Sequence, residues 1–237
     1  MKWSQISEIG LVRAGNEDSM CACPEIGLFA VADGMGGHRA GEIASSTALS
    51  LLKEQLKNSS VEQEDVATNL LCIMDEANQR IYQLSCENEQ FRGMGTTVTA
   101  GIILGNELII AHVGDSRAYL IRSDDILQIT NDHSLVGEML RCGGLTEEQA
   151  INHPQKNVLT RAMGTAPNIR IDLYRKDIQV GDKILFCTDG LTNHLRPQEI
   201  KEIILTQSDP GKCLRELMKI ALDRGGLDNI TMVLVEI

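Results

Sequence analysis

The sequence predicts an α+β fold in which antiparallel sheets pack against layers of helices. Segments typical of strands and of helices come in blocks along the 237 residues rather than in strict alternation, which favours antiparallel pairing. The apolar segments 97–104 and 107–113 flank Gly105-Asn106, a two-residue turn typical of a β-hairpin. No linker, repeat or low-complexity tract interrupts the chain, so we expect one domain over residues 1–237.

Three helices are expected outside the strand-rich regions. The first begins near Ala40 and ends near Lys57. Another begins at Asp209-Pro210, where Asp suits the N-cap and Pro the first helical position, and ends near Arg224. The clearest helix lies between these two, because its apolar side chains recur at helical spacing on one face. They are Val66, Leu70, Ile73, Ala77, Ile81 and Leu84.

The remaining regular elements are predicted strands. Each is a short apolar run bounded by residues that favour turns, which is typical of a strand buried on one or both faces. We expect strands at 2–9, 28–33, 116–122, 126–129, 169–174, 183–188 and 231–235.

Residues 133–165 have a different character. They contain a short helical stretch at 134–141, then Gly143-Gly144, then Thr146-Glu-Glu-Gln149, which matches a capping box. Large apolar residues are few, and there is no long periodic element. An irregular insertion between strands is typical of a lid, so we expect this segment to form a mobile flap beside a cleft.

Composition restricts the possible partners and the compartment. The chain has 33 acidic and 22 basic residues, a net charge of −11, which argues against a nucleic-acid or anionic-membrane surface. The most apolar stretch, 99–113, is broken by Gly105-Asn106-Glu107 and is too short to span a bilayer. The N-terminal residues lack the apolar core of a signal peptide. We therefore expect a cytoplasmic protein with neither a nucleic-acid nor a membrane partner.

The seven cysteines are expected to be reduced thiols, because their number is odd and no C-x-x-C pair occurs. Cys21-x-Cys23 is interpreted as strand sequence with one cysteine on each face. Cys86 and Arg92 match the C-x₅-R spacing of cysteine phosphatases. That segment lacks the glycines that would present amide groups to phosphate, so the match is interpreted as accidental.

Acidic residues next to glycine or asparagine are the most informative feature of the chain. Taken alone, an Asp-Gly pair is usually a turn. Here two apolar runs end in such a pair, and further acids stand in similar short motifs. Carboxylates brought together from distant segments repel one another unless a cation lies between them, and oxygen ligands suit Mg²⁺ or Mn²⁺. The candidate ligands are Glu17, Asp18, Asp33, Asp115, Asp189 and Asp228.

Two further residues are candidates for contact with a substrate. Arg13 stands just before Asn16-Glu17-Asp18 and could be a charge partner of these acids. It could also hold an anionic substrate, since its fork of donors suits phosphate. His38 follows Gly34 by four residues and could be a general acid, although a lone histidine is more often structural.

Taken in order, eight short motifs of this chain resemble those of the PPM family of metal-dependent protein phosphatases, the type-2C serine/threonine phosphatases. The similarity is to the compact bacterial members and runs from about residue 4 to residue 235. The motifs are Arg13…Asn16-Glu17-Asp18, Ala32-Asp33-Gly34-Met-Gly-Gly-His38, Gly95-Thr-Thr97, Val113-Gly114-Asp115-Ser-Arg117, Asp132-His133-Ser134, Leu159-Thr-Arg-Ala-Met-Gly164, Cys187-Thr-Asp189-Gly190-Leu-Thr and Asp228-Asn229-Ile-Thr231.

The resemblance implies a four-layer sandwich, with two antiparallel β-sheets packed together and flanked by α-helices. It also implies hydrolysis of phosphoserine and phosphothreonine in proteins by a water activated in a two-metal centre, opposing serine/threonine kinases. The expected cofactors are two Mn²⁺ or Mg²⁺ ions, with a third, weaker ion possible. The expected partners are phosphorylated proteins, including a serine/threonine kinase, and a monomer is expected.

The resemblance also implies a role for each candidate residue. Asp33 would bridge the two core ions, and Arg13 would hold the phosphate of the substrate. His38 would protonate the leaving alkoxide. The family often has aspartate where this chain has Asn193, which leaves occupancy of a third metal position open. The implied metal ligands are Asp33, Gly34 through its carbonyl, Asp189, Asp228, Glu17 and Asp18, with Asp115 at the third position.

Two other functions fit the sequence less well. A sensor module that kept the fold and lost catalysis is disfavoured because the core acids, Arg13 and His38 are all present. Turnover of a simple aryl phosphate would discriminate it from an enzyme. A metal nuclease would need a basic groove, which a chain with a net charge of −11 does not suggest.

Overall fold

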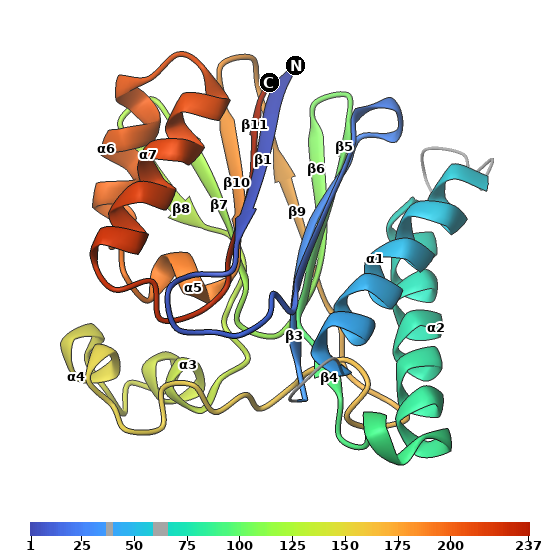
Figure 1. The fold of residues 1–237 in the computed structure, drawn as a ribbon. Helices are drawn as coiled ribbons and strands as arrows, with labels where there is room; N and C mark the ends of the chain where they lie inside the picture. The colour runs from blue at the N-terminus through green and yellow to red at the C-terminus, as the bar shows by residue number, and fades with distance from the viewer. Residues whose placement is uncertain (37–39, 59–65) are drawn as a thin grey trace.

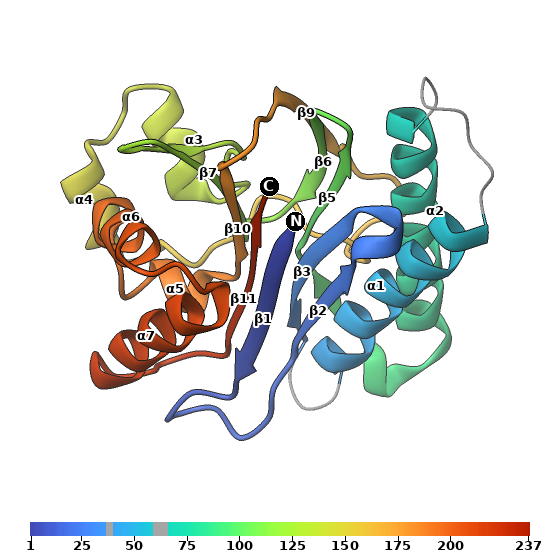
Figure 2. The ribbon, with the colours of Figure 1, turned by 90° about the horizontal axis from the view of Figure 1, so that it is seen from above.

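Two antiparallel sheets stand face to face, with helices against both outer surfaces, as Figures 1 and 2 show. The structure is a computed structural model, and it describes residues 1–36, 40–58 and 66–237. The first strand, β1 (Lys2–Glu8), pairs along its length with the last, β11 (Ile230–Glu236). The expected sandwich of two sheets flanked by helices is confirmed.

The first sheet is covered by helices from the C-terminal half of the chain. Its strand order is β1-β11-β10-β7-β8. The outer face of this sheet packs against α6 and α7, and α5 follows β10 at one end (Figure 1). The bounds of these elements are β7 Arg117–Arg122, β8 Asp125–Gln128, β10 Lys183–Cys187, α5 Asp189–Thr192, α6 Pro197–Thr206 and α7 Pro210–Asp223.

The second sheet is covered by two long helices, α1 (Ala40–Asn58) and α2 (Val66–Glu87). Its strand order is β2-β3-β5-β6-β9, and β4 pairs with the end of β3. The flap segment carries two short helices of its own. The bounds of the other elements are β2 Asp18–Cys23, η1 Pro24–Ile26, β3 Leu28–Met35, η3 Glu89–Phe91, β4 Gly95–Thr96, β5 Val98–Leu104, β6 Glu107–Val113, α3 Leu135–Arg141, α4 Glu147–Ile151 and β9 Asp172–Asp177.

The buried side chains form three apolar layers, which explains the continuous apolar runs in the sequence. In β3, Leu28 and Ala30 belong to the layer beneath α1 and α2, whereas Phe29 and Val31 belong to the layer between the sheets. Successive strand residues point to opposite faces, so a strand buried on both faces has no polar alternation. The third layer lies between the first sheet and its helices.

Several local predictions are confirmed. Leu104 pairs with Glu107 across the Gly105-Asn106 turn, where Gly105 has a φ of 58°. The Asp209 side chain accepts a hydrogen bond from the Lys212 amide at the start of α7, at 2.7 Å. The capping box at Thr146 is also present. In each case the controlling interaction spans two or three residues, so the local sequence specifies it.

Other local predictions were wrong or missing. The strand expected at 169–174 is β9, which spans Asp172–Asp177. Its limits were misplaced because its residues are alternately exposed, so the sequence pattern does not mark where the strand begins or ends. Helix α6 and the full extent of β2 were not predicted. Cys21 and Cys23 do not point to opposite faces. Both are buried in one apolar layer, with their sulfur atoms 3.7 Å apart. Residues i and i+2 of a strand point to the same face, so the prediction of opposite faces was wrong.

The strand ends determine where the acidic residues meet. Asp18 at the start of β2 pairs in register with Asp33 near the end of β3. Asp189 is the second residue after β10, separated from it by Thr188. Asp228 is the second residue before β11, separated from it by Asn229. These strands deliver their carboxylates to the same end of the sandwich, opposite the chain termini in Figure 1. No helix in the described ranges has the length and apolar character needed to cross a membrane.

Candidate metal centre

A cleft of about 220 Å³ opens at this end of the sandwich and brings most of the predicted site residues together. Arg13 lines the cleft, as do Asn157 and Leu159 of the segment 133–165. Asp18 lies behind the wall, buried next to Asp33. The predicted residues in the lining are Arg13, Glu17, Asp33, Gly34, Asp115, Asp189 and Asp228.

Asp33 is held at the floor of the cleft by Thr97, which lies between β4 and β5. Its amide donates to Thr97 Oγ1 at 2.9 Å, and the Thr97 amide donates to its carbonyl at 2.8 Å. Burial raises the pKa of Asp33 well above its usual value, and the charges of Asp18 and Asp189 raise it further. The protein alone therefore does not favour ionised Asp33, whereas a cation in the cleft would.

Gly34 allows the backbone of β3 to approach two other segments. A side chain at this position would collide with the carbonyls of Gly41 and Glu17. The Gly34 amide donates to the Glu17 carbonyl at 3.2 Å, which fixes the segment that carries Glu17 and Asp18 against β3. The motif therefore needs glycine here for close packing of three backbone segments.

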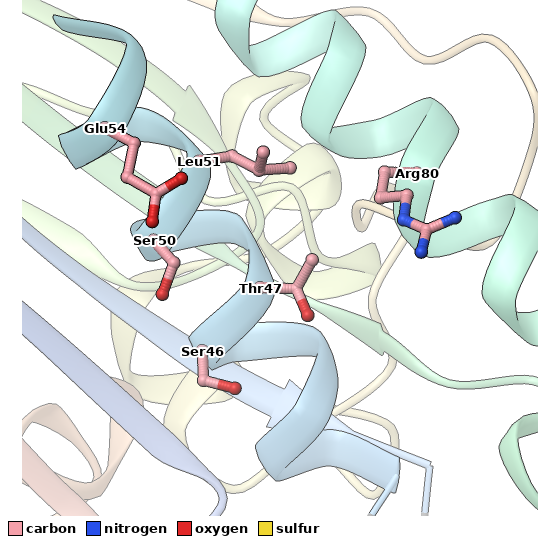
Figure 3. A pocket seen from close by; sticks show the side chains of 6 residues that line it. All are labelled: Ser46, Thr47, Ser50, Leu51, Glu54 and Arg80. Carbon is pink, nitrogen blue, oxygen red and sulfur yellow. The ribbon is translucent and has the colours of Figure 1, made fainter.

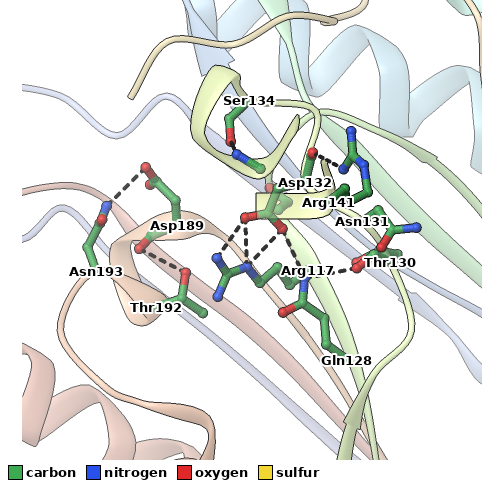
Figure 4. A network of polar contacts seen from close by, with 12 residues as sticks. Arg117, Gln128, Thr130, Asn131, Asp132, Ser134, Arg141, Asp189, Thr192 and Asn193 are labelled. Carbon is green, nitrogen blue, oxygen red and sulfur yellow. Dashed lines mark hydrogen bonds and ion pairs between the residues drawn. The ribbon is translucent and has the colours of Figure 1, made fainter. Parts of the chain in front are cut away.

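Asp18 and Asp189 each keep one oxygen without a protein partner. Thr188 Oγ1 donates to Asp18 Oδ2 at 2.9 Å, and Asn193 Nδ2 donates to Asp189 Oδ2 at 3.0 Å, as Figure 4 shows for Asn193. The other oxygen of each carboxylate, Oδ1, is buried and makes no hydrogen bond. Burial raises the pKa of Asp18 to about 7, and burial and the Asp228 charge raise the pKa of Asp189.

Asp115 is positioned through the preceding Gly114, and His133 binds both polar groups of that glycine. The His133 amide donates to the Gly114 carbonyl at 2.7 Å, and the Gly114 amide donates to His133 Nδ1 at 3.1 Å. Since Nδ1 accepts, the ring proton lies on Nε2, which faces Asp172 Oδ2 at 3.2 Å. Burial raises the pKa of Asp115 well above its usual value, and the charge of Asp189 adds to this.

A second polar network lies directly behind Asp115. Arg117 binds both carboxylate oxygens of Asp132, with distances of 2.6 Å from Nη2 and 2.9 Å from Nε, as Figure 4 shows. Gln128 also donates to Asp132, at 3.0 Å. This satisfied pair fixes the start of the flap segment, because Asp132 directly precedes His133.

Arg13 lies at the mouth of the cleft, where its Nη2 is 2.6 Å from Asp228 Oδ2. Asn229 supports this arrangement in a way that the sequence did not indicate. Its Nδ2 donates to the carbonyls of Ile9 and Gly15, both at 2.9 Å, and its Oδ1 accepts from the Glu17 amide at 2.8 Å. Asn229 thereby ties the loop that carries Arg13 to the start of β11.

These residues fit a divalent metal by their chemistry. The donors are carboxylate oxygens, two of them buried without partners, and their mutual repulsion would be relieved by a cation. Within the described ranges, no three acidic, histidine or cysteine side chains already surround one point as a ligand set. Arg13 and Asn193 each occupy one carboxylate oxygen instead. An ion bound to these two oxygens would displace Arg13 and Asn193 from them.

A second pocket, of about 280 Å³, lies between α1 and α2 and has a different chemistry (Figure 3). It has one acid and one base, and no cluster of carboxylates converges there. Its lining residues are Ser46, Thr47, Ser50, Leu51, Glu54 and Arg80. The other candidate of the sequence, His38, lies outside the described residues.

The chain is similar to bacterial serine/threonine phosphatases over nearly its whole length. The serine/threonine phosphatase Stp of Listeria innocua is 41% identical over 211 residues, which cover 88% of this chain and 84% of that protein. The protein phosphatase PhpP of Streptococcus pneumoniae is 38% identical over 239 residues, which cover 99% of this chain and 97% of that protein.

Solved structures have the same fold. The serine/threonine phosphatase PstP/Ppp of Mycobacterium tuberculosis superposes with a TM-score of 0.92 at 35% identity, covering 100% of this chain and 98% of that one. A structure of the PstP catalytic domain in complex with two manganese ions has a TM-score of 0.89 at 34% identity, covering 99% and 97%. The family model for protein phosphatase 2C matches residues 2–138. The chain therefore belongs to the protein phosphatase 2C family and is a serine/threonine protein phosphatase.

Proposed function

We propose that the chain hydrolyses phosphoserine and phosphothreonine in proteins by means of a two-metal centre in the acidic cleft. The observation that carries this proposal is the pair of buried, unpartnered oxygens on Asp18 and Asp189, in a set of carboxylates with raised pKa values. A structural neighbour bound to two manganese ions supports the same number and kind of ion.

The ligands that we propose lie at or next to the ends of five strands, namely β2, β3, β6, β10 and β11. When bound, Mn²⁺ or Mg²⁺ would neutralise the charge of the phosphate and lower the pKa of a water molecule in the cleft. The charges of Asp18, Asp189, Asp115 and Asp228 all act on Asp33, so Asp33 would contribute to holding both core ions. Glu17 and Asp18 would act directly or through bound water, and Asp115 would serve a third, weaker ion. The proposed core ligands would be Asp33, the Gly34 carbonyl, Asp189 and Asp228.

Two side chains would act on the substrate. The Arg13 guanidinium would leave Asp228 and bind two phosphate oxygens, since its donors match that geometry. His38 would give a proton to the leaving alkoxide of serine or threonine, whose own pKa is too high for it to leave unprotonated. Both roles rest on the position of each residue within its motif and stay proposals.

The biological setting is likewise a proposal. We propose that residues 1–237 form one catalytic domain with a flap at about 133–165, and that it acts as a cytoplasmic monomer. Its substrates would be phosphorylated proteins that include a serine/threonine kinase. The names of the relatives support phosphoprotein substrates as a class.

The test is phosphatase activity with defined metal content. Protein freed of metal by EDTA would be assayed on p-nitrophenyl phosphate and on a phosphothreonine peptide, then again after addition of Mn²⁺ or Mg²⁺. We expect turnover only with metal. Full activity in excess EDTA would reject the metal centre, and no turnover of any ester with Mn²⁺ would favour a sensor module. Cleavage of plasmid DNA would favour a nuclease.

A further inference from the structure

Three large apolar side chains are exposed together at the rim of the cleft. The exposed fractions are 67% for Leu11, 65% for Val12 and 61% for Leu227. Val158 is 45% exposed between the cleft-lining residues Asn157 and Leu159, in the segment 133–165. Others, such as Val180, lie away from the cleft, and scattered exposed apolar side chains are normal for a protein surface. We refer to Leu11, Val12 and Leu227 as the apolar shelf.

The two segments that carry the shelf are joined to each other. The Leu11 amide donates to the Gly226 carbonyl at 2.7 Å, and the Leu11 side chain packs over Gly226, where a Cβ atom would fit tightly against Leu222 and Leu11. On the other side, the Leu227 amide donates to His194 Nε2 at 3.3 Å. Figure 1 shows the loop after β1 running beside the loop after α7. The shelf is therefore held in place before any partner binds.

The shelf is continuous with the proposed phosphate site along both segments. Val12 directly precedes Arg13, and Leu227 directly precedes Asp228, and these two charged residues form the ion pair at the mouth of the cleft. A protein segment that reaches Arg13 from the side of Leu11 and Leu227 passes over this rim. A residue next to its phosphorylated residue would then meet the apolar shelf.

We propose that the apolar shelf binds an apolar side chain next to the phosphorylated residue of a substrate protein. This inference rests on the proposed function, because it needs the phosphate to enter the cleft. Acidic flanking residues would be disfavoured by the carboxylates beyond the rim, and polar ones would leave the apolar side chains exposed. The shelf thus favours substrates with leucine or a similar residue beside the phosphorylated position.

A second copy of the chain is a poorer occupant. A stable interface between proteins buries about 800 Å² on each partner, and three side chains offer only a fraction of that area. A short peptide segment anchored by its phosphate needs far less additional contact, since the anchor already supplies most of its affinity.

The experiment compares two phosphothreonine peptides that differ only in having leucine or glutamine on each side of the phosphorylated residue. Wild type, Leu11→Gln, Leu227→Gln and the double variant would be assayed with Mn²⁺. Leu205→Gln is the matched control. It is 40% exposed on α6, near the end where Lys183 binds the Ile204 carbonyl, opposite the cleft. p-Nitrophenyl phosphate reports the metal centre alone.

We expect wild type to have a kcat/KM about three- to tenfold higher for the leucine peptide, a range typical of partial burial of one aliphatic side chain. The double variant should lose this preference, while Leu205→Gln keeps it. Equal rates on the two peptides in wild type, with p-nitrophenyl phosphate hydrolysed, would overturn the inference. So would a wild-type dimer that the double variant abolishes without a change in peptide preference. No hydrolysis of p-nitrophenyl phosphate would instead reject the proposed function.

Discussion

Arg13 and Asp228 form an ion pair at the mouth of the cleft, with 2.6 Å between Nη2 and Oδ2. The side chain of Arg13 is 53% exposed, so solvent screens the pair and its loss costs little. Asp228 is a proposed metal ligand, and Arg13 is a proposed phosphate ligand. A metal ion that binds Asp228 would displace the guanidinium, which is then available to the substrate. Metal binding and phosphate binding are therefore expected to be coupled through this contact.

Arg13→Ala is expected to raise the KM for p-nitrophenyl phosphate by about tenfold or more, with a smaller effect on kcat, because the phosphate loses a bidentate partner. The affinity for Mn²⁺ should be unchanged or higher, since a competing cation has left Asp228. Steady-state kinetics and calorimetric Mn²⁺ titration measure the two effects. Arg13→Lys should reverse only part of the increase in KM, because an ammonium group cannot bind two phosphate oxygens with paired N–H donors as a guanidinium does. An unchanged KM in Arg13→Ala would make the arginine a charge partner only.

Replacing a buried carboxylate of the cleft should stabilise the metal-free protein. In EDTA, Asp189→Asn removes one of the mutually repelling acids, so its Tm should exceed that of wild type by a few degrees, about 2–4 °C per kcal/mol for a chain of this size. The stabilisation of wild type by Mn²⁺ should be lost in the variant, together with turnover.

Thermal unfolding with and without Mn²⁺ checks this prediction. Asp223→Asn, on the exposed side of α7, is the matched control and should behave as wild type in both conditions. A lower Tm for Asp189→Asn in EDTA would mean that the carboxylate stabilises the fold without a bound cation.

The site could be located from the sequence because its residues follow strand ends. Asp33 and Asp189 stand directly after apolar runs, and antiparallel strands buried on both faces brought them to one end of the sandwich. The hairpin at Gly105 and the start of α7 were predictable for a similar reason, since short local interactions determine both.

The supporting contacts could not be predicted, because they join residues far apart in the chain. His133 binds the backbone of Gly114, and Asn229 binds the backbone of Ile9 and Gly15. Each is a single polar residue without a periodic neighbourhood, so only the folded chain reveals its partner. The limits of β9 were lost because an edge strand with alternating polar residues has no contrast with the loops beside it.

Histidine burial predicts how stability depends on pH. His112 is fully buried beside His133, and desolvation lowers its pKa from 6.5 to about 3. The folded state therefore keeps this ring neutral, while the unfolded chain takes up a proton below pH 6.5. The contribution of neutral His112 is complete above pH 6.5 and is lost as the pH falls from 6.5 towards 3, by up to about 1.4 kcal/mol per pH unit.

Urea unfolding at pH 7.5, 6 and 5 measures this effect as a comparison of variants. His112→Gln should have a shallower loss of unfolding free energy below pH 6.5 than wild type. The buried acids of the cleft have raised pKa values, so they stabilise the folded state as the pH falls, opposite to His112. This contribution is the same in both proteins and cancels when the two are compared. Parallel pH profiles for the two proteins would show that His112 does not titrate on unfolding in this range.

The flap is expected to move only in its distal part. Its stem is tied at both ends, because Ser134 forms a bridge with Leu159 and Thr96 with Met163. Amides in residues 142–157 should therefore exchange with solvent much faster than those of β5 and β6, as measured by hydrogen exchange with mass spectrometry. Protection as strong as that of the sheet strands would reject a mobile flap. Replacement of 142–157 should change protein-substrate preference more than turnover of small esters.

Asn193 offers a test of the proposed third ion. Its amide donates to Asp189 Oδ2 at 3.0 Å, so in this protein the side chain stabilises a carboxylate of the core rather than adding charge of its own. Asn193→Asp would replace that donor with a carboxylate, which has the same negative charge as Asp189. Without metal, the two carboxylates would repel each other and the Tm in EDTA should fall. With Mn²⁺, the added charge should bind cations more strongly, by about tenfold if one charge-assisted contact is gained.

The stabilisation by Mn²⁺ should therefore be larger in Asn193→Asp than in wild type, and half-maximal activity should be reached at lower metal concentration. Asn193→Ala separates the two effects, because it removes the donor to Asp189 without adding charge and should lower the Tm in EDTA without a gain in metal affinity. Superimposable metal titrations of wild type and Asn193→Asp would mean that position 193 does not contact a catalytic ion. Asn193 would then be a polar residue at the end of α5 whose role is to hold Asp189 in place.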